Sequence, residues 1–287
     1  MFSSMASYVN RLDSTAVSQS SIIRWSCPVP FFGEMAGATV ATVGINPSSR
    51  EFLSADGIEL QGEERRLPTL RSLGCRSWLE VDAVQIKEII AACETYFLRS
   101  PYNRWFQVLE KVLAPAGVSL YRRGGQACHI DLVPYATNAK WGSLPLAEQR
   151  NLIEVSRDAL ARLLHDSQLS ALILNGQSVV REFERTAEIE LERCAMPDWV
   201  LPRSRGAAVR GLAYTGHVDH IGGVDIGREL IVVGYNHNLQ SSFGVTSAVV
   251  SAIARWLASV TDGVVRGATT RPSRSTASRA PACSVRG

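Results

Sequence analysis

Small and amide side chains follow four apolar runs of the sequence. The segments are GINPS (44–48), DLVPYATN (131–138), NGQS (175–178) and GYNHNLQSS (234–242). Amide groups donate and accept hydrogen bonds, and glycine lets a ligand approach the backbone closely. Side chains of this kind can bind a phosphate group or the edge of a nucleobase. Each segment alone also fits an ordinary turn, in which Gly and Asn are common.

The sequence offers no metal or dinucleotide site of known spacing. Its six cysteines lie far apart, without the C-x-x-C spacing of a zinc or iron–sulfur site. His217, Asp219 and His220 have metal-binding side chains, but we expect them in a Gly-flanked loop and their spacing is not an established zinc pattern. A G-x-G-x-x-G motif is absent after the first apolar run. We therefore predict no cofactor and no metal.

The pattern of apolar residues predicts the elements that position the four polar segments. Runs rich in Val, Ile and Leu at 39–44, 127–133, 170–175 and 229–234 are typical of buried parallel strands. We therefore expect an α/β fold, a three-layer α/β/α sandwich around a central, mainly parallel four-stranded sheet. Ligands of such sheets bind outside the carboxyl ends of the strands. Helical spacing is found at 81–98, 104–114, 144–166, 177–194 and 245–257.

Motifs at these strand ends resemble those of the uracil-DNA glycosylase superfamily. VATVGINPSSREF (40–52) is similar to the Asn-bearing form of its first motif, G-x-N-P-[GS]. CHIDLVP (128–134) and the helical segment from 138 to 160 resemble the single-strand-selective monofunctional branch, and YNHNLQSSFG (235–244) takes the place of the last motif. The resemblance covers about residues 35 to 260, with little identity outside the motifs. It implies a uracil-DNA glycosylase-like fold and DNA glycosylase activity.

The resemblance implies that Asn46 positions the attacking water. Its amide can accept a hydrogen bond from water while the other edge of the group is held by the protein. The same motif implies that Gly44, Ile45 and Pro47 bind the substrate and that Ser48 contacts DNA. An Asn-Pro turn after a strand is the structural alternative for Asn46.

Asp131 lies where the family has an Asn that reads the base. A carboxylate accepts hydrogen bonds, so it repels O4 of uracil but suits the N4 amine of cytosine. A buried Asp with a raised pKa could also protonate the ring at N3. The structural alternative is a loop or helix-capping role. We also place Asn175 in the substrate site and take Phe52 as the nearest base-stacking side chain, whereas Trp105 is expected in the core.

The last motif leaves one catalytic role open between two residues. The family uses a His there to support the charge that develops on the base O2. Alignment of Leu239 with the family's wedge Leu places Tyr235 at that position, and His237 lies two residues further on. A structural role is the alternative for His237.

Leu239 and the residues after it are implied to contact DNA. Leu239 fits a side chain that fills the gap left by a flipped nucleotide, and a core-facing Leu is the alternative. The other expected DNA contacts in this segment are Gln240, Ser241 and Ser242.

Composition and charge indicate a globular, cytoplasmic protein. The 287 residues are 46% hydrophobic and 20% charged, without the apolar run that a membrane span or signal peptide needs. The net charge is +3, yet the first 260 residues hold 25 basic and 26 acidic groups, a low balance for a duplex binder. We expect a single glycosylase-like domain over 1–260 and a basic, disordered tail over 261–287.

These observations predict a hydrolase that flips a base out of duplex or single-stranded DNA and excises it, leaving an abasic site. Because cytosine is a normal base, we expect a modified cytosine. The resemblance to the superfamily, together with Asp131, implies glucosylated hydroxymethylcytosine of phage DNA and a role in anti-phage defence. One alternative is a repair glycosylase for uracil or other deaminated bases, and another is an inactive, DNA-binding member of the superfamily. We expect no membrane association and no obligate protein partner.

Overall fold

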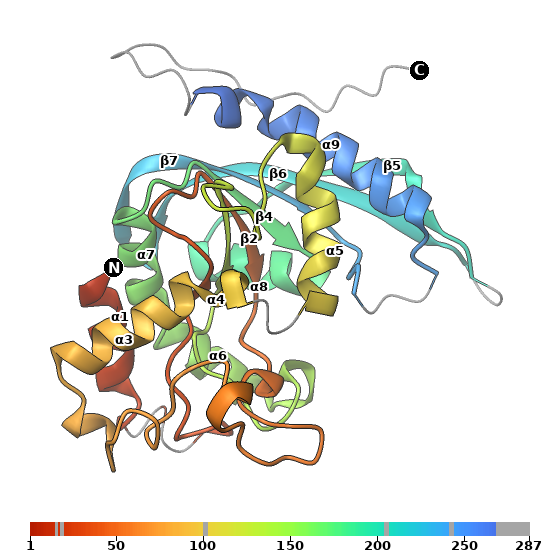
Figure 1. The fold of residues 1–287 in the computed structure, drawn as a ribbon. Helices are drawn as coiled ribbons and strands as arrows, with labels where there is room; N and C mark the ends of the chain where they lie inside the picture. The colour runs from red at the N-terminus through yellow and green to blue at the C-terminus, as the bar shows by residue number, and fades with distance from the viewer. Residues whose placement is uncertain (15–16, 18–19, 100–102, 204–206, 241–243, 268–287) are drawn as a thin grey trace.

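A computed structural model describes residues 1–14, 17, 20–99, 103–203, 207–240 and 244–267. These residues form one mixed seven-stranded sheet with the strand order β1-β3-β2-β4-β7-β6-β5 (Figure 1). The chain is therefore an α/β protein. The strands are β1 (Phe31–Phe32), β2 (Val40–Gly44), β3 (Ala127–Asp131), β4 (Ala171–Asn175), β5 (Glu192–Leu201), β6 (Val209–Ile221) and β7 (Val224–Tyr235).

The four strands predicted from the apolar runs are confirmed, and they form the parallel core of the sheet. β3, β2, β4 and β7 pair in parallel, in that order. Every residue of β2, β3 and β4 is buried. Burial on both faces explains why these strands read as continuous apolar runs rather than as alternating patterns.

The expected four-stranded sheet is too small, because three antiparallel strands extend it. β1 pairs with β3 at one edge, and β6 and β5 continue the sheet beyond β7. The helix predicted over 177–194 is too long: α8 (Gln177–Ala187) ends at Glu188, which has a left-handed φ of 57°. β5 begins at Glu192 with mostly exposed residues, so it lacks the apolar signal of a buried strand.

Helices surround the sheet, and α3 shows how the sequence starts one. Asp82 and Gln85 form a reciprocal capping box at its first turn. The helix predicted over 144–166 is divided after Val155, where the Ser156 hydroxyl donates to the Leu152 carbonyl at 2.7 Å. Besides α8, the α-helices of the described residues are α1 (Phe2–Arg11), α3 (Ala83–Glu94), α4 (Tyr96–Arg99), α5 (Asn103–Leu113), α6 (Leu146–Glu154), α7 (Arg157–His165) and α9 (Ser247–Gly267).

Helix α9 is longer than the sequence predicted. It lies beside α5 (Figure 1) and packs Trp256 against Trp199 of β5, with ring centroids 5.2 Å apart. Thr261 is buried and its hydroxyl donates to the Leu257 carbonyl, so α9 continues past the expected boundary at residue 260. Residues 261–267 of the predicted disordered tail are therefore helical, and 268–287 lie outside the described residues.

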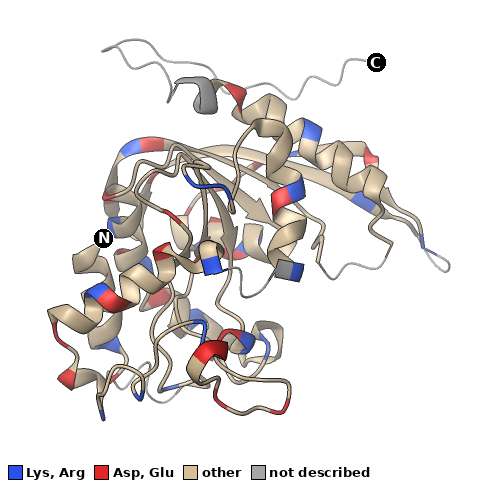
Figure 2. Ribbon diagram, viewed as in Figure 1, with Lys and Arg blue, Asp and Glu red and all other residues tan. Residues whose placement is uncertain are grey.

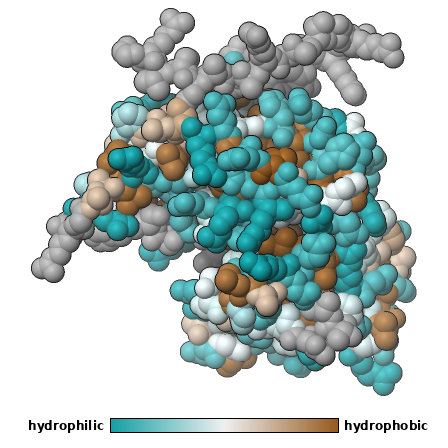
Figure 3. Space-filling model, turned by 180° about the vertical axis from the view of Figure 1, so that it is seen from behind, coloured by the Kyte–Doolittle hydropathy of each residue, from teal (hydrophilic) through white to brown (hydrophobic). Residues whose placement is uncertain are grey.

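Charged groups of both signs share the surface. Lys and Arg are interspersed with Asp and Glu over the helices, while the central strands carry few charges (Figure 2). The face seen from behind is mostly hydrophilic, with scattered hydrophobic residues (Figure 3). Within the described ranges, no helix has the length and hydropathy to cross a membrane.

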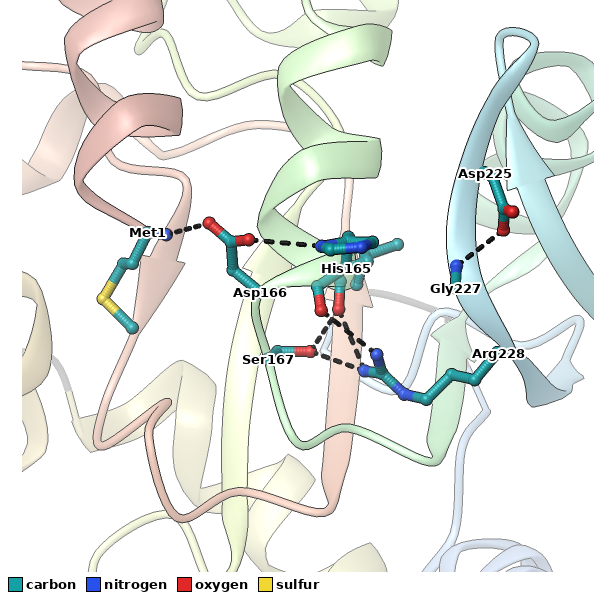
Figure 4. Close-up of polar contacts among 8 residues, drawn as sticks. Met1, His165, Asp166, Ser167, Asp225, Gly227 and Arg228 are labelled. Atoms are coloured by element: carbon teal, nitrogen blue, oxygen red, sulfur yellow. Dashed lines mark hydrogen bonds and ion pairs between the residues drawn. The ribbon is translucent and has the colours of Figure 1, made fainter.

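Arg228 of β7 binds the carboxyl end of α7 to the sheet (Figure 4). Its guanidinium donates to the carbonyls of Leu164 and Leu169, each at 2.9 Å. Asp166, at the same helix end, binds the amino group of Met1. The start of α1, the end of α7 and β7 are thereby joined by charged hydrogen bonds.

We expect Arg228→Met to lower the free energy of unfolding by about 1–3 kcal/mol, because carbonyls at the end of α7 lose a charged donor. Urea unfolding followed by circular dichroism measures the loss. Arg162→Met is the matched control, since Arg162 makes an exposed pair with Asp158 on the same helix that contributes less than about 0.5 kcal/mol. Equal losses in the two variants would contradict this role of Arg228.

Candidate active site

A cavity of about 170 Å³ lies at the carboxyl ends of β2 and β3. It is lined by Gly44 at the end of β2, by residues 45–48 and Glu51 after it, and by His129 and Asp131 of β3. Its volume is below the roughly 300–1,000 Å³ of drug-sized ligand sites, so it suits a small ring system. The first and second sequence motifs therefore meet in one cavity, as their places after neighbouring parallel strands predict.

Gly44 lies directly under two polar side chains of β3. It stands opposite Asp131 in the parallel ladder. A Cβ at Gly44 would lie 2.4 Å from Asp131 Oδ1 and 2.8 Å from His129 Nε2. Beyond the strands, the Val133 amide donates to the Ile45 carbonyl at 2.8 Å. The absence of a side chain at residue 44 therefore makes room for the two polar side chains of β3.

The Asn46 amide is held in one orientation. Its Nδ2 donates to the carbonyls of Tyr135 and Pro47, at 3.2 and 3.3 Å, and to Thr137 Oγ1 at 3.2 Å. Carbonyls only accept, so the NH2 edge must face them. Thr137 donates its own proton to the Ala139 carbonyl, which leaves Oγ1 to accept from Asn46. No described residue donates to Asn46 Oδ1, so this oxygen can accept a hydrogen bond from water.

Asp131 and His129 form a buried pair on the floor of the cavity. Asp131 Oδ1 lies 3.5 Å from His129 Nε2, and His129 Nδ1 lies 2.8 Å from the hydroxyl oxygen of Thr42. Burial raises the pKa of Asp131, and the hydrogen bond from His129 partly opposes this shift. Asp131 is the last residue of a strand and lines the cavity, so it is neither a helix cap nor a loop residue.

Glu51 is a second buried carboxyl in the same cavity, and sequence reasoning missed it. Its side chain is 3% exposed. The Tyr96 hydroxyl donates to Oε2 at 2.7 Å, and Arg66 Nη1 lies 3.9 Å from the same oxygen. Burial raises the pKa of Glu51 to about 7, although Tyr96 and Arg66 lower it, and Asp131 raises it further. No spacing rule relates a carboxyl at this position to the Asn motif.

Aromatic rings from two separate elements form the apolar walls. Phe32 of β1 and Trp105 and Phe106 of α5 line the cavity. Their ring centroids lie 5.8, 5.3 and 5.2 Å from that of His129. Trp105 is therefore in the cavity wall and not only in the core. Phe52, the stacking residue expected from sequence, is 1% exposed and does not line the cavity.

Tyr235 and Asn175 form a different polar cluster at the ends of β7 and β4, where they are opposite each other in the ladder. The Tyr235 hydroxyl donates to Asn175 Oδ1 at 2.9 Å, and Asn175 Nδ2 donates to Gln240 Oε1 at 3.2 Å. Burial raises the pKa of Tyr235. None of these three residues lines the cavity at Asn46.

His237 and Leu239 are also buried away from this cavity. His237 Nε2 lies 2.5 Å from the Trp199 carbonyl, so it must carry the proton that it donates. Burial lowers the pKa of His237, and this hydrogen bond opposes the shift. Leu239 is 7% exposed. The structure therefore brings neither Tyr235 nor His237 to the cavity, and Ser241 and Ser242 lie outside the described residues.

The segment with His217, Asp219 and His220 lies in strand β6, and the expectation of a loop is wrong. His217 Nδ1 is 3.3 Å from Glu229 Oε2, and His220 Nδ1 is 2.9 Å from Asp219 Oδ1. Across the described part of the chain, no group of three or more His, Cys, Asp or Glu side chains is arranged to hold a metal ion.

The cavity thus combines an oriented amide, two buried carboxyls and aromatic walls. Such a set can orient a water molecule, bind polar edges of a flat ring and stack on its face. No protein-family model and no curated protein matches the chain.

We expect Gly44→Ala to lower the free energy of unfolding by about 1–3 kcal/mol, because the new methyl group overlaps the Asp131 carboxyl and the His129 ring. Urea unfolding measures the change. Gly142→Ala is the control, since a Cβ there meets nothing within 4 Å. An unchanged stability of Gly44→Ala would contradict the close packing of the Asp131 and His129 side chains over residue 44.

The buried Glu51 carboxyl predicts a pH-dependent stability. Its folded pKa of about 7 is above the ordinary value of 4.5, so ionisation opposes folding. The contribution of Glu51 is fully favourable below about pH 4.5 and is lost as pH rises through about 7. The difference in free energy of unfolding between Glu51→Gln and the natural protein should therefore shift by roughly 2–3 kcal/mol in favour of the variant between about pH 5 and pH 8.

Urea unfolding at both pH values measures this gain. Glu63→Gln, which changes an exposed carboxyl, is the control and should show no comparable gain. The same stability difference between Glu51→Gln and the natural protein at both pH values would mean that Glu51 does not titrate in this range.

Proposed function

We propose that the protein is a monofunctional DNA glycosylase that hydrolyses the N-glycosidic bond of a base flipped into the cavity. The observation that carries this proposal is the fixed Asn46 amide, whose Nδ2 edge is fully used by the protein while Oδ1 is left to accept from water. A water held in one orientation beside a bound nucleotide reaches the reactive geometry without further loss of freedom. The resemblance of the first motif to the uracil-DNA glycosylase superfamily supports the same role.

The Asp131 carboxyl favours a cytosine-type base. One of its oxygens can accept a hydrogen bond from the N4 amine, and in its ionised form the carboxyl would repel the O4 of uracil. Its raised pKa also favours a proton on the carboxyl, which could pass to N3 of the ring. A ring that carries this proton leaves more easily, because the proton compensates the negative charge that the ring gains when the bond to C1′ breaks.

The aromatic walls suit the flat base that such an enzyme must hold outside the duplex. Phe32, Trp105 and Phe106 can contact the faces of a ring, and stacking on aromatic side chains contributes about 1–3 kcal/mol per base. Ser48 is exposed at the cavity, where its hydroxyl could contact a DNA phosphate. The helices on the sheet are, in this proposal, the outer layers of a glycosylase-like α/β/α sandwich.

The substrate in this proposal is a modified cytosine. Unmodified cytosine is present throughout cellular DNA, so an enzyme that excised it would destroy its host genome. The substrate must therefore have the hydrogen-bonding edge of cytosine and a substituent that cellular cytosine lacks. Glucosylated 5-hydroxymethylcytosine of phage DNA has both. Excision would leave abasic sites in phage DNA and would protect the cell from infection.

We expect purified protein to produce abasic sites in DNA that contains glucosylated 5-hydroxymethylcytosine. Asn46→Ala should lower the single-turnover rate by about 100-fold or more, because the water loses its orienting acceptor. Asn10→Ala, an exposed Asn on α1, is the control and should act as the natural protein does. Alkaline cleavage of the labelled product reports each abasic site.

The same assay with uracil, cytosine and 5-hydroxymethylcytosine separates the alternatives. Excision of uracil alone would assign the protein to repair and would make the proposed role of Asp131 wrong. Binding of the modified DNA without an abasic product, unchanged in Asn46→Ala, would identify a binding protein and contradict the hydrolytic proposal.

A further inference from the structure

Glu51 is a buried carboxyl of the cavity that the reaction described above does not use. It lies at the end of the short 3₁₀ helix η1 (Ser49–Glu51), which starts directly after the Asn46 motif. The Ser48 hydroxyl oxygen accepts from the Arg50 amide at 3.2 Å, and the Glu51 amide donates to the Ser48 carbonyl at 3.0 Å. These bonds fold the chain back, so Asn46 and Glu51 enter one cavity from one segment.

The groups that face Glu51 come from three separate parts of the chain. Tyr96 of α4 donates to Oε2 at 2.7 Å, and Arg66 lies 3.9 Å from that oxygen. Asp131 of β3 interacts with Glu51 as a like charge, and His129 lines the cavity beside Asp131. Both contacts to protein donors engage Oε2. Within the described residues, Glu51 Oε1 has no hydrogen-bond donor and is left for a ligand in the cavity.

This set of contacts is weak for a carboxyl with a purely structural role. A buried carboxylate that stabilises a fold is normally matched by close, bidentate charged donors. Glu51 has one hydroxyl donor and a guanidinium that is beyond hydrogen-bond distance. Its pKa of about 7 lets the group bind and release a proton near neutral pH, which is the property of a general base.

We propose that Glu51 is the general base of the hydrolysis and accepts a proton from the water that Asn46 orients. The inference rests on the proposed glycosylase function. The water oxygen forms a bond to C1′ of the deoxyribose while the bond between C1′ and the base breaks, and one water proton passes to Glu51 Oε1. The electron pair of the broken bond stays on the base, which takes the proton from Asp131. After product release, a proton returns from Glu51 to Asp131 through solvent.

The two carboxyls then have the roles of the two carboxyls in inverting glycoside hydrolases, where one accepts a proton from water and the other donates a proton to the leaving group. Their surroundings differ accordingly. Asp131 is next to the His129 ring, whereas Glu51 is next to the phenol of Tyr96. Tyr96 is a positioning residue in this scheme, because its hydrogen bond stabilises the carboxylate form of Glu51 and lowers the pKa of the base.

The test is the pH dependence of single-turnover excision of glucosylated 5-hydroxymethylcytosine from DNA, measured from about pH 5.5 to pH 9. With the natural protein, the rate should rise through about pH 7 as Glu51 ionises. Glu51→Gln keeps the size and the acceptor for Tyr96, but it should lower the rate by about 100-fold and remove the rise. DNA affinity should stay unchanged, because only the reactive step loses a group.

Tyr96→Phe gives a second readout that a structural role would not produce. It removes the donor that stabilises the Glu51 carboxylate, so the rise in rate should shift to higher pH. Glu63→Gln should leave both the rate and the profile unchanged. Circular dichroism confirms that each variant is folded.

The outcomes separate this inference from the proposed function. Excision by the natural protein with an unchanged rate and profile in Glu51→Gln would overturn the role of Glu51 alone. The absence of any rise in rate as pH increases towards neutrality would also overturn it, because Glu51 must ionise before it can accept a proton from water. No excision of any base by the natural protein would instead reject the glycosylase function itself.

Discussion

The parallel register of β2 and β3 is the constraint on which the candidate site depends. It sets Gly44 opposite Asp131, and the missing side chain at residue 44 leaves room for the side chains of both Asp131 and His129 on that face of the sheet. Because the two strands end together, the loops that follow them leave the sheet side by side. The Asn46 amide is consequently held by the Tyr135 carbonyl and the Thr137 hydroxyl of the neighbouring loop. The orientation of the amide is thus a property of the ladder and not of the motif alone.

Asp131 and Glu51 share one apolar-walled cavity, although the proposed reaction needs one of them protonated and the other ionised. Burial favours the protonated forms of Asp131 and Glu51, and the like charge of Asp131 raises the pKa of Glu51 further. Their hydrogen-bond partners then distinguish them, since one borders an imidazole and the other a phenol with an arginine behind it. Groups that differ in this way can exchange protons in opposite directions during one reaction.

The second parallel pair, β4 and β7, builds a different kind of site at the same edge of the sheet. Tyr235 and Asn175 face each other in the ladder and bond directly, and Gln240 continues the chain of hydrogen bonds. His237 is bound to the Trp199 carbonyl of β5. These side chains fix the loop after β7 to the sheet. The polar residues of the last motif therefore hold a loop in place, whereas residues of the first two motifs line a cavity.

Local sequence patterns predicted the four parallel strands and placed Asn46 and Asp131 at the carboxyl ends of two of them, because continuous apolar runs and the residues that end them are local signals. They did not predict β5, whose residues are mostly exposed, or β6, whose buried, half-buried and exposed residues form no continuous apolar run. They also did not predict the break between α6 and α7. Only the tertiary structure brought Glu51, Phe32 and Trp105 to the cavity and moved Phe52 out of it. The physical reason is that burial, partners and protonation of a side chain depend on neighbours from distant parts of the chain, which no local pattern contains.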